Sequence, residues 1–257
     1  MPKPIVVSFD TPSDLANSSA RDFLDVVSFA VREKGTAHVS LTGGSMGIAI
    51  LEAVAQSSIS QDIDWSKVHF WWSDERFVAQ NDDDRNSLQA HNALLSQLSI
   101  PAENIHQMGS TDKFSSAEEA ATSYAQELAR FAVESASTPV FDVTLLGMGP
   151  DGHIASLFPQ RDEILNRDEI TLAIHHSPKP PADRVTLTLP VINSSERIWF
   201  LISGEDKKEA LGRLTQAAKL SSHEISTAIL QQTPAAGARG TSETLIRVSR
   251  NAMTQED

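Results

Sequence analysis

One histidine in this chain stands where acid–base chemistry is possible, directly after an apolar run and a glycine-rich turn. Residues 145–159 read Leu-Leu-Gly-Met-Gly-Pro-Asp-Gly-His-Ile-Ala-Ser-Leu-Phe-Pro, and the histidine is His153. A histidine titrates near neutral pH and is a common general base. A single histidine is more often a capping or core residue, and we expect the other seven to be structural. Asp151 is a candidate to orient His153, although it is equally plausible as a helix cap.

A glycine turn, Thr42-Gly43-Gly44-Ser45, follows a second apolar run and precedes an apolar helical pattern. Gly43, Gly44 and Ser45 are therefore candidates to offer backbone amides to an anion at the start of a helix. The alternative is a tight turn that needs glycine only for its backbone conformation. The turn lacks the Lys-Ser or Lys-Thr of a Walker loop, and it does not contain the Gly-x-Gly-x-x-Gly dinucleotide fingerprint.

Charged residues follow a third apolar run, in the segment Ser73-Asp74-Glu75-Arg76. Asp74 is a candidate to orient His153 or to bind a sugar hydroxyl, and Arg76 is a candidate anion ligand. The alternative is a solvated turn with a local ion pair. The nearby acidic run 82–84 has no spacing typical of a metal loop, so we expect no bound metal.

Three further basic residues are candidate anion ligands. Lys179 and Arg184 lie in and after a proline-rich stretch, and Lys207 lies in the first turn of a predicted helix. A lysine in a first turn opposes the helix dipole, which favours a second role for Lys207, although a plain surface lysine is the commoner case. Arginine binds phosphate in a bidentate manner, so Arg76 and Arg184 rank above the lysines as phosphate ligands.

Strand and helix patterns alternate along the chain and must position these residues. Apolar or β-rich runs predict strands at 5–9, 38–41, 68–72, 105–108, 142–146, 171–174, 185–189, 198–202 and 245–248. Helical patterns are predicted over 11–35, 48–54, 86–98 and 115–134, with a further helix from Ser203. This alternation predicts an α/β fold of three layers, Rossmann-like, with a mostly parallel central sheet flanked by helices. In such sheets ligands bind at the carboxyl ends of strands, where the candidate residues stand.

Composition narrows the class of protein. The 257 residues carry a formal net charge of −13 and no cysteine. A charge of this sign argues against a nucleic acid or an anionic membrane as partner, and the absence of cysteine excludes disulfides and thiolate chemistry. The amino-terminal residues show no signal-peptide pattern, and no apolar run approaches the roughly 18 residues of a membrane helix. We expect one domain over residues 1–257 in a cytoplasmic protein, and a loop rather than a domain linker at Ser177–Pro181.

Taken together, these segments resemble the 6-phosphogluconolactonase family, which is related to the hexosamine-phosphate isomerases and deaminases. The resemblance runs from residue 42 to residue 207 and is most specific in Gly-x-Gly-Pro-Asp-Gly-His. One departure is Met46-Gly47, where many relatives carry Thr-Pro. The resemblance implies a hydrolase of the oxidative pentose phosphate pathway that converts 6-phospho-D-glucono-1,5-lactone to 6-phospho-D-gluconate (EC 3.1.1.31). It also implies a cytosolic enzyme with no cofactor, whose partner is a phosphorylated sugar lactone. We expect a monomer or a weak homo-oligomer.

Two related classes are alternatives to a lactonase. Deaminases of this superfamily carry a catalytic glutamate five residues after the histidine, where this chain has Phe158, and typically a tyrosine where it has Arg76. Sugar-phosphate sensors carry a preceding helix-turn-helix, for which the first predicted strand at Ile5 leaves no room. Both comparisons favour the lactonase, with His153 as the general base on water.

Overall fold

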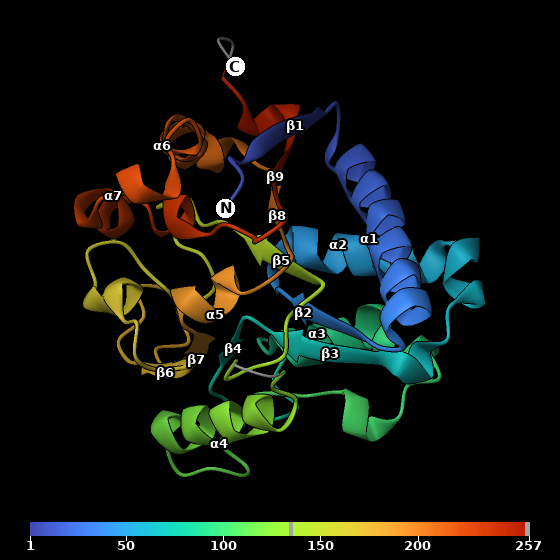
Figure 1. The fold of residues 1–257 in the computed structure, drawn as a ribbon. Coiled ribbons are helices and arrows are strands. Elements are labelled where there is room, and N and C mark those ends of the chain that lie inside the picture. Colours follow the sequence, from blue (N-terminus) through green and yellow to red (C-terminus); the bar gives the residue numbers. More distant parts are fainter. Residues whose placement is uncertain (134–135, 255–257) are drawn as a thin grey trace.

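A six-stranded parallel sheet forms the centre of the computed structural model, which describes residues 1–133 and 136–254 (Figure 1). Each strand pairs in parallel with its neighbour in the described structure. In spatial order the strands are β1 (Ile5–Phe9), β9 (Glu243–Ser249), β8 (Arg197–Ile202), β5 (Val143–Gly147), β2 (Ala37–Leu41) and β3 (Val68–Trp72). The predicted strand at 142–146 lies in the middle of the sheet, as its lack of polar residues indicates.

Helices cover both faces of this sheet and give it three layers. Along β5, Val143 and Leu145 face one apolar core, whereas Leu146 faces the other, because successive side chains of a strand point to opposite faces. The first face is covered by α1 (Pro12–Lys34), α2 (Gly44–Gln56) and α3 (Asn86–Ala93). The second is covered by α4 (Ala117–Arg130), α5 (Leu189–Asn193), α6 (Lys208–Ala218) and α7 (Thr227–Gln232). The predicted fold class is therefore confirmed.

A small antiparallel sheet lies beside the central one. Its strands, in spatial order, are β4 (Asp74–Arg76), β7 (Arg184–Leu187) and β6 (Thr171–Ile174). Strand–helix alternation predicts parallel pairing, and for the predicted strands 171–174 and 185–189 this prediction is wrong. Only the proline-rich loop separates them, and without a crossover helix two consecutive strands pair antiparallel. The stretch Ser177–Pro181 is that loop, as predicted.

Several predicted element boundaries differ from the observed ones. The strand predicted at 105–108 is reduced to a single bridge between Phe70 and Ile105. The helix predicted over 86–98 ends at Ala93, because the backbone of Leu94 leaves the helical region. The helix predicted over 115–134 spans Ala117–Arg130, and its predicted end at Glu134 lies outside the described residues. Helix α7 has no counterpart among the predicted elements.

The first helix shows how local chemistry fixes an element as predicted. The Thr11 side chain accepts a hydrogen bond from the Asp14 amide, and the Asp14 carboxylate accepts one from the Thr11 amide. Pro12 occupies the first helical position, where its missing N–H costs nothing. Gly35 ends the helix with a φ of 82°, a left-handed conformation that glycine adopts without strain. Among the described residues, no helix has both the length and the apolar character needed to cross a bilayer.

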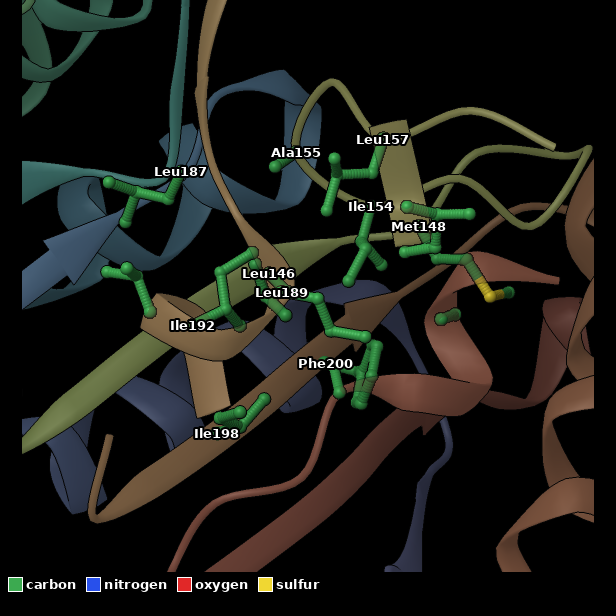
Figure 2. Close-up of a cluster of buried hydrophobic side chains, with 14 of the residues drawn as sticks. Leu146, Met148, Ile154, Ala155, Leu157, Leu187, Leu189, Ile192, Ile198 and Phe200 are labelled. Atoms are coloured by element: carbon green, nitrogen blue, oxygen red, sulfur yellow. The ribbon is translucent and has the colours of Figure 1, made fainter. Parts of the chain in front are cut away.

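The apolar core on the second face supports the segment that carries the candidate histidine. Figure 2 shows Leu146 and Met148, which precede His153, together with Ile154 and Leu157, which follow it. These side chains pack in one cluster with residues of β7, α5 and β8. The candidate histidine is therefore anchored on both sides along the chain by buried apolar groups.

Candidate active site

The candidate site is a cleft of about 180 Å³ at the carboxyl ends of β2, β3 and β5. Eight of the ten candidate residues line it: His153, Asp74, Gly43, Gly44, Arg76, Lys179, Arg184 and Lys207. Asp151 lies behind His153 rather than in the wall, and Ser45 is exposed in the first turn of α2. The wall also contains residues that we did not predict as site residues: Thr42, Asn86, Gly147, Met148, Gly149 and Ala155.

The glycine turn after β2 presents the uncapped start of α2 to the cleft. Gly43 is the N-cap residue, and it has no side chain to accept a hydrogen bond from the first amides of the helix. Gly44 has a φ of 81°, which favours glycine. Thr42 ties the turn to β5, because its Oγ1 accepts a hydrogen bond from the Gly147 amide at 3.3 Å. The first amides of α2 are therefore free to bind an anion in the cleft.

The carboxylate of Asp74 is held in the wall of the cleft by two hydrogen-bond donors and an ion pair. Its Oδ2 accepts a hydrogen bond from Ser156 Oγ at 2.6 Å and lies 3.9 Å from Arg184 Nη1. Its Oδ1 is 3.4 Å from Asn86 Nδ2. Of the two roles predicted for Asp74, the orientation of His153 has no counterpart among the contacts of the described residues.

Glu75 points away from the cleft and binds the backbone behind the cleft wall. Its carboxylate accepts hydrogen bonds from the amides of Arg76, Asn86 and Ser87 at 2.7–2.8 Å and lies 3.6 Å from Arg85 Nη2. Burial raises the pKa of Glu75, although Arg85 and the three amides act to lower it. Alternation along β4 thus sends Asp74 and Arg76 to the cleft and Glu75 into the protein.

Asn86 is a wall residue that the sequence does not reveal. Its Nδ2 donates a hydrogen bond to the Asp74 carbonyl oxygen at 2.9 Å. Its Oδ1 lies so close to Gly43 that a Cβ there would be 1.8 Å away. Any side chain at position 43 would therefore displace Asn86. The two residues are 43 positions apart, and no local motif connects them.

The turn after β5 forms the imidazole setting that the sequence predicts. His153 Nδ1 lies 2.5 Å from Asp151 Oδ1, so Nδ1–H donates to the carboxylate and Nε2 is left as the acceptor. Burial acts to raise the pKa of Asp151, but the hydrogen bond and charge of His153 outweigh it and lower the pKa to about 2. Gly149 makes room for the ring, because a Cβ there would lie 2.0 Å from His153 Nδ1.

The two arginines of the cleft differ in how far the protein engages their donors: Arg184 uses all three of its side-chain nitrogens, whereas the buried Nε of Arg76 has no partner among the described residues. Arg184 is buried and donates to the carbonyl oxygens of Lys179, Pro180 and Pro181 at 3.1–3.3 Å. The Arg76 Nη1 donates to the carbonyl oxygen of Asp84. Both guanidinium groups therefore shape the cleft through backbone contacts as well as charge.

The two lysines are better placed to reach a ligand. Within the described residues, Lys179 Nζ makes no hydrogen bond or ion pair, and Lys207 Nζ pairs only with Asp206 at 2.9 Å. Burial lowers the pKa of Lys179; the charges of Lys207 and Arg184 add to this effect, and Asp151 and Asp206 oppose it. Neighbouring cations that lower the pKa of Lys179 mark a place where an anion would be stabilised.

Comparison with known proteins agrees with this geometry. The family model described as glucosamine-6-phosphate isomerases/6-phosphogluconolactonase matches residues 10–246. The chain is 40% identical over 245 residues to a 6-phosphogluconolactonase of Streptomyces coelicolor, covering 94% of this chain and 90% of that protein. It is 40% identical over 240 residues to a 6-phosphogluconolactonase of Mycobacterium tuberculosis, covering 93% and 92%. The crystal structure of a 6-phosphogluconolactonase from Thermotoga maritima superposes with a TM-score of 0.78 at 29% identity, covering 96% and 100% of the two chains.

Proposed function

The chain belongs to the glucosamine-6-phosphate isomerase/6-phosphogluconolactonase family, and we propose that its cleft hydrolyses 6-phospho-D-glucono-1,5-lactone to 6-phospho-D-gluconate. The relatives named 6-phosphogluconolactonase identify the reaction, a hydrolysis of a carboxylic ester in the pentose phosphate pathway. The single observation that carries our mechanism is the Asp151–His153 pair at 2.5 Å, with His153 in the wall of the cleft.

His153 acts as the general base in this mechanism. Its Nε2 takes a proton from water while the water oxygen attacks the lactone carbonyl carbon, and Asp151 stabilises the imidazolium that forms. The tetrahedral intermediate then collapses with cleavage of the bond between the carbonyl carbon and the ring oxygen. The imidazolium returns its proton to that ring oxygen, so the products are a free hydroxyl and a carboxylic acid, which ionises.

Two anions must be held during this reaction, the phosphate of the substrate and the developing oxyanion. Lys179 and Lys207 are our phosphate ligands, because their ammonium groups are less engaged than the guanidinium of Arg184, which the sequence ranks above them. Arg184 and Arg76 add positive charge to the same cleft. The amides at the start of α2 serve either the phosphate or the oxyanion, since fixed N–H donors suit both. Asp74 is our ligand for a sugar hydroxyl.

The deaminase alternative lacks a residue to perform its chemistry here. Phe158 stands five positions after His153, is 1% exposed, and lies with its ring centroid 4.7 Å from that of His153. The guanidinium of Arg184 also lies 5.8 Å from the centroid of the Phe158 ring. An apolar ring at this position supplies no carboxylate for an acid–base role.

The test is a pair of assays on the purified protein. The phospholactone is generated in place from glucose 6-phosphate, and its hydrolysis is measured against the spontaneous rate; in parallel, ammonia release from glucosamine 6-phosphate is measured. We expect acceleration of the first reaction and none of the second. Ammonia release without lactone hydrolysis would show that the proposed function is wrong. We further propose that the enzyme acts in the cytoplasm and that it is a monomer or a weak homo-oligomer. Sedimentation of the purified chain tests the oligomeric state.

A further inference from the structure

Arg213, a residue of α6 outside the cleft wall, reaches the turn that carries the candidate base. Its Nη2 donates a hydrogen bond to the main-chain oxygen of Asp151 at 2.9 Å. Its Nε donates to Thr233 Oγ1 at 2.9 Å, and its Nη1 pairs with Glu209 Oε1 at 2.6 Å. The side chain thus uses all three of its nitrogens, and one of them fixes the residue that orients His153.

Within the turn, Asp151 Oδ1 faces both the amide and the Nδ1 of His153, and among the described residues the only hydrogen bond to Asp151 from outside the turn comes from Arg213. Gly152 has a φ of 95°, and its amide bonds back to the Gly149 carbonyl oxygen at 3.0 Å. Its own carbonyl oxygen accepts a hydrogen bond from the Ala235 amide at 3.0 Å. The main-chain oxygen of Asp151 is the next one back along the chain. Because this oxygen is attached next to the Asp151 Cα, a shift of the chain at this point would move the carboxylate relative to His153 Nδ1.

We propose that Arg213 is a positioning residue for the reaction: it holds the Asp151 peptide so that the carboxylate stays on His153 Nδ1. This inference rests on the proposed function, in which His153 is the general base. Arg213 touches neither substrate nor base, so it acts only through Asp151. Its loss therefore lowers kcat and leaves KM nearly unchanged, because the phosphate ligands are on other segments.

The chain offers a matched control in Arg239. This arginine is 2% exposed and donates to the main-chain oxygens of Leu220 and Ala217 at 2.9 and 3.0 Å, at the far end of α6. Arg239→Ala therefore also removes an arginine that hydrogen-bonds to main-chain oxygens, here those at the end of α6, and it does not touch the Asp151 turn. We expect it to lower the unfolding midpoint and leave kcat within about twofold of the parent.

The geometry also allows the missing group to be restored from solvent. Arg213 and Thr233 line a groove of about 700 Å³ between α6 and α7. In Arg213→Ala, a free guanidinium ion can enter through this groove and donate to the Asp151 oxygen, with Glu209 to balance its charge. Millimolar guanidinium should raise the kcat of this variant and should not raise that of Arg239→Ala.

The experiment measures kcat and KM on the phospholactone for the parent, Arg213→Ala, Arg213→Lys, Arg239→Ala, Asp151→Ala and the Arg213→Ala/Asp151→Ala double variant. We expect Arg213→Ala to lose about tenfold or more in kcat, Arg213→Lys to lose less, and the double variant to be no slower than Asp151→Ala within about twofold. Additive losses, or a loss confined to KM, would overturn the proposal.

One further readout, together with the activity of the parent, keeps the inference separate from the proposed function and from a folding defect. Proton NMR observes the His153 Nδ1–H directly and needs no substrate. Its hydrogen-bonded resonance should be present in the parent and in Arg239→Ala, and it should be weakened in Arg213→Ala. If Arg213→Ala does not fold, the same weakening is expected in Arg213→Lys. An unchanged resonance overturns the proposal even if lactone hydrolysis is confirmed. A parent protein that does not hydrolyse the lactone overturns the proposed function alone.

Discussion

Mild acid should destabilise this protein through three histidines at the end of the sheet opposite the cleft. His38 is the second residue of β2, His69 is the second residue of β3, and His106 follows the bridge beside β3. Trp71 Nε1–H donates to His38 Nδ1 at 3.2 Å, and His69 Nδ1 lies 3.0 Å from His106 Nε2. The rings of His38 and His69 are stacked with centroids 4.6 Å apart. A proton on His38 Nδ1 would break the hydrogen bond that Trp71 donates, so the fold favours neutral His38.

Burial gives the sign of the effect. Burial, with a smaller contribution from the charges of His69, His106 and Lys34, lowers the pKa of His38 to about 3. Burial also lowers the pKa of His106 to about 4, although its hydrogen bond to the Glu127 carboxylate acts to raise it. The pKa of an unfolded histidine is about 6.5. Because the folded values lie below the unfolded one, the stabilisation is present above about pH 6.5 and is lost as pH falls below it.

The magnitude follows from linkage. At pH 5 an unfolded histidine has bound its proton while His38 and His106 in the fold remain largely neutral. Because pH 5 lies about 1.5 units below the unfolded pKa of about 6.5, each of these histidines lowers the free energy of unfolding by about 2 kcal/mol at that pH. The partial exposure of His38 to solvent reduces this, so we expect a loss of roughly 1–2 kcal/mol for each histidine between pH 7.5 and pH 5. The carboxylate of Asp151, with a pKa of about 2, contributes nothing in this range.

Urea unfolding at pH 7.5 and pH 5 measures this loss, in the parent and in His38→Gln. Glutamine keeps an oxygen acceptor for Trp71 Nε1–H but does not titrate. The variant should lose about 1–2 kcal/mol less than the parent on acidification. His175 is a control of opposite sign, because hydrogen bonds to Asp183 and Glu118 raise its pKa, so His175→Gln should lose at least as much as the parent. Equal losses in the parent and in His38→Gln would refute the reasoning.

Four predictions concern the cleft. His153→Ala should retain its fold and lose at least about 100-fold in kcat on the phospholactone; a near-normal kcat would remove His153 from the mechanism. Gly149→Ala should lose about tenfold or more in kcat, because its Cβ would lie 2.0 Å from the imidazole, whereas Gly212→Ala, whose Cβ meets nothing within 4 Å, should not. Lys207→Ala should raise KM for the phospholactone about tenfold or more but not for unphosphorylated gluconolactone, and equal effects on both lactones would contradict the phosphate assignment. EDTA should leave the activity intact, because no group of three or more His, Asp or Glu side chains in the described part of the chain has the geometry to bind a metal; activity restored by one divalent ion would refute this.

The strands of the central sheet are predictable because each is a short apolar run with its own signal. The small sheet is not predictable in this way. Its first strand is Asp74–Arg76, three charged residues with low intrinsic preference for a strand. It forms because β7 provides antiparallel hydrogen-bonding partners, with Asp74 opposite Thr186 and Arg76 opposite Arg184. That register also brings the side chains of Asp74 and Arg184 into one wall, although the two residues are 110 positions apart. Pairing between distant segments leaves no trace in the local pattern of either one.

The same distinction separates the site residues that the sequence reveals from those it conceals. A group that meets a ligand tends to follow a strand, and the backbone next to it must turn sharply. Glycines in the sequence therefore indicate its position, as do Gly43 and Gly44 at the start of α2 and Gly149 and Gly152 around His153. A group that holds such a residue in place can come from any element, and its own neighbours in sequence need no special conformation. Asn86 stands at the start of a helix and Arg213 within one, and each acts on a turn more than 40 positions away. The bonds by which they hold the site, from Asn86 to the Asp74 carbonyl and from Arg213 to the Asp151 carbonyl, end on main-chain oxygens, which every residue has, so the sequence of the turn does not point to them.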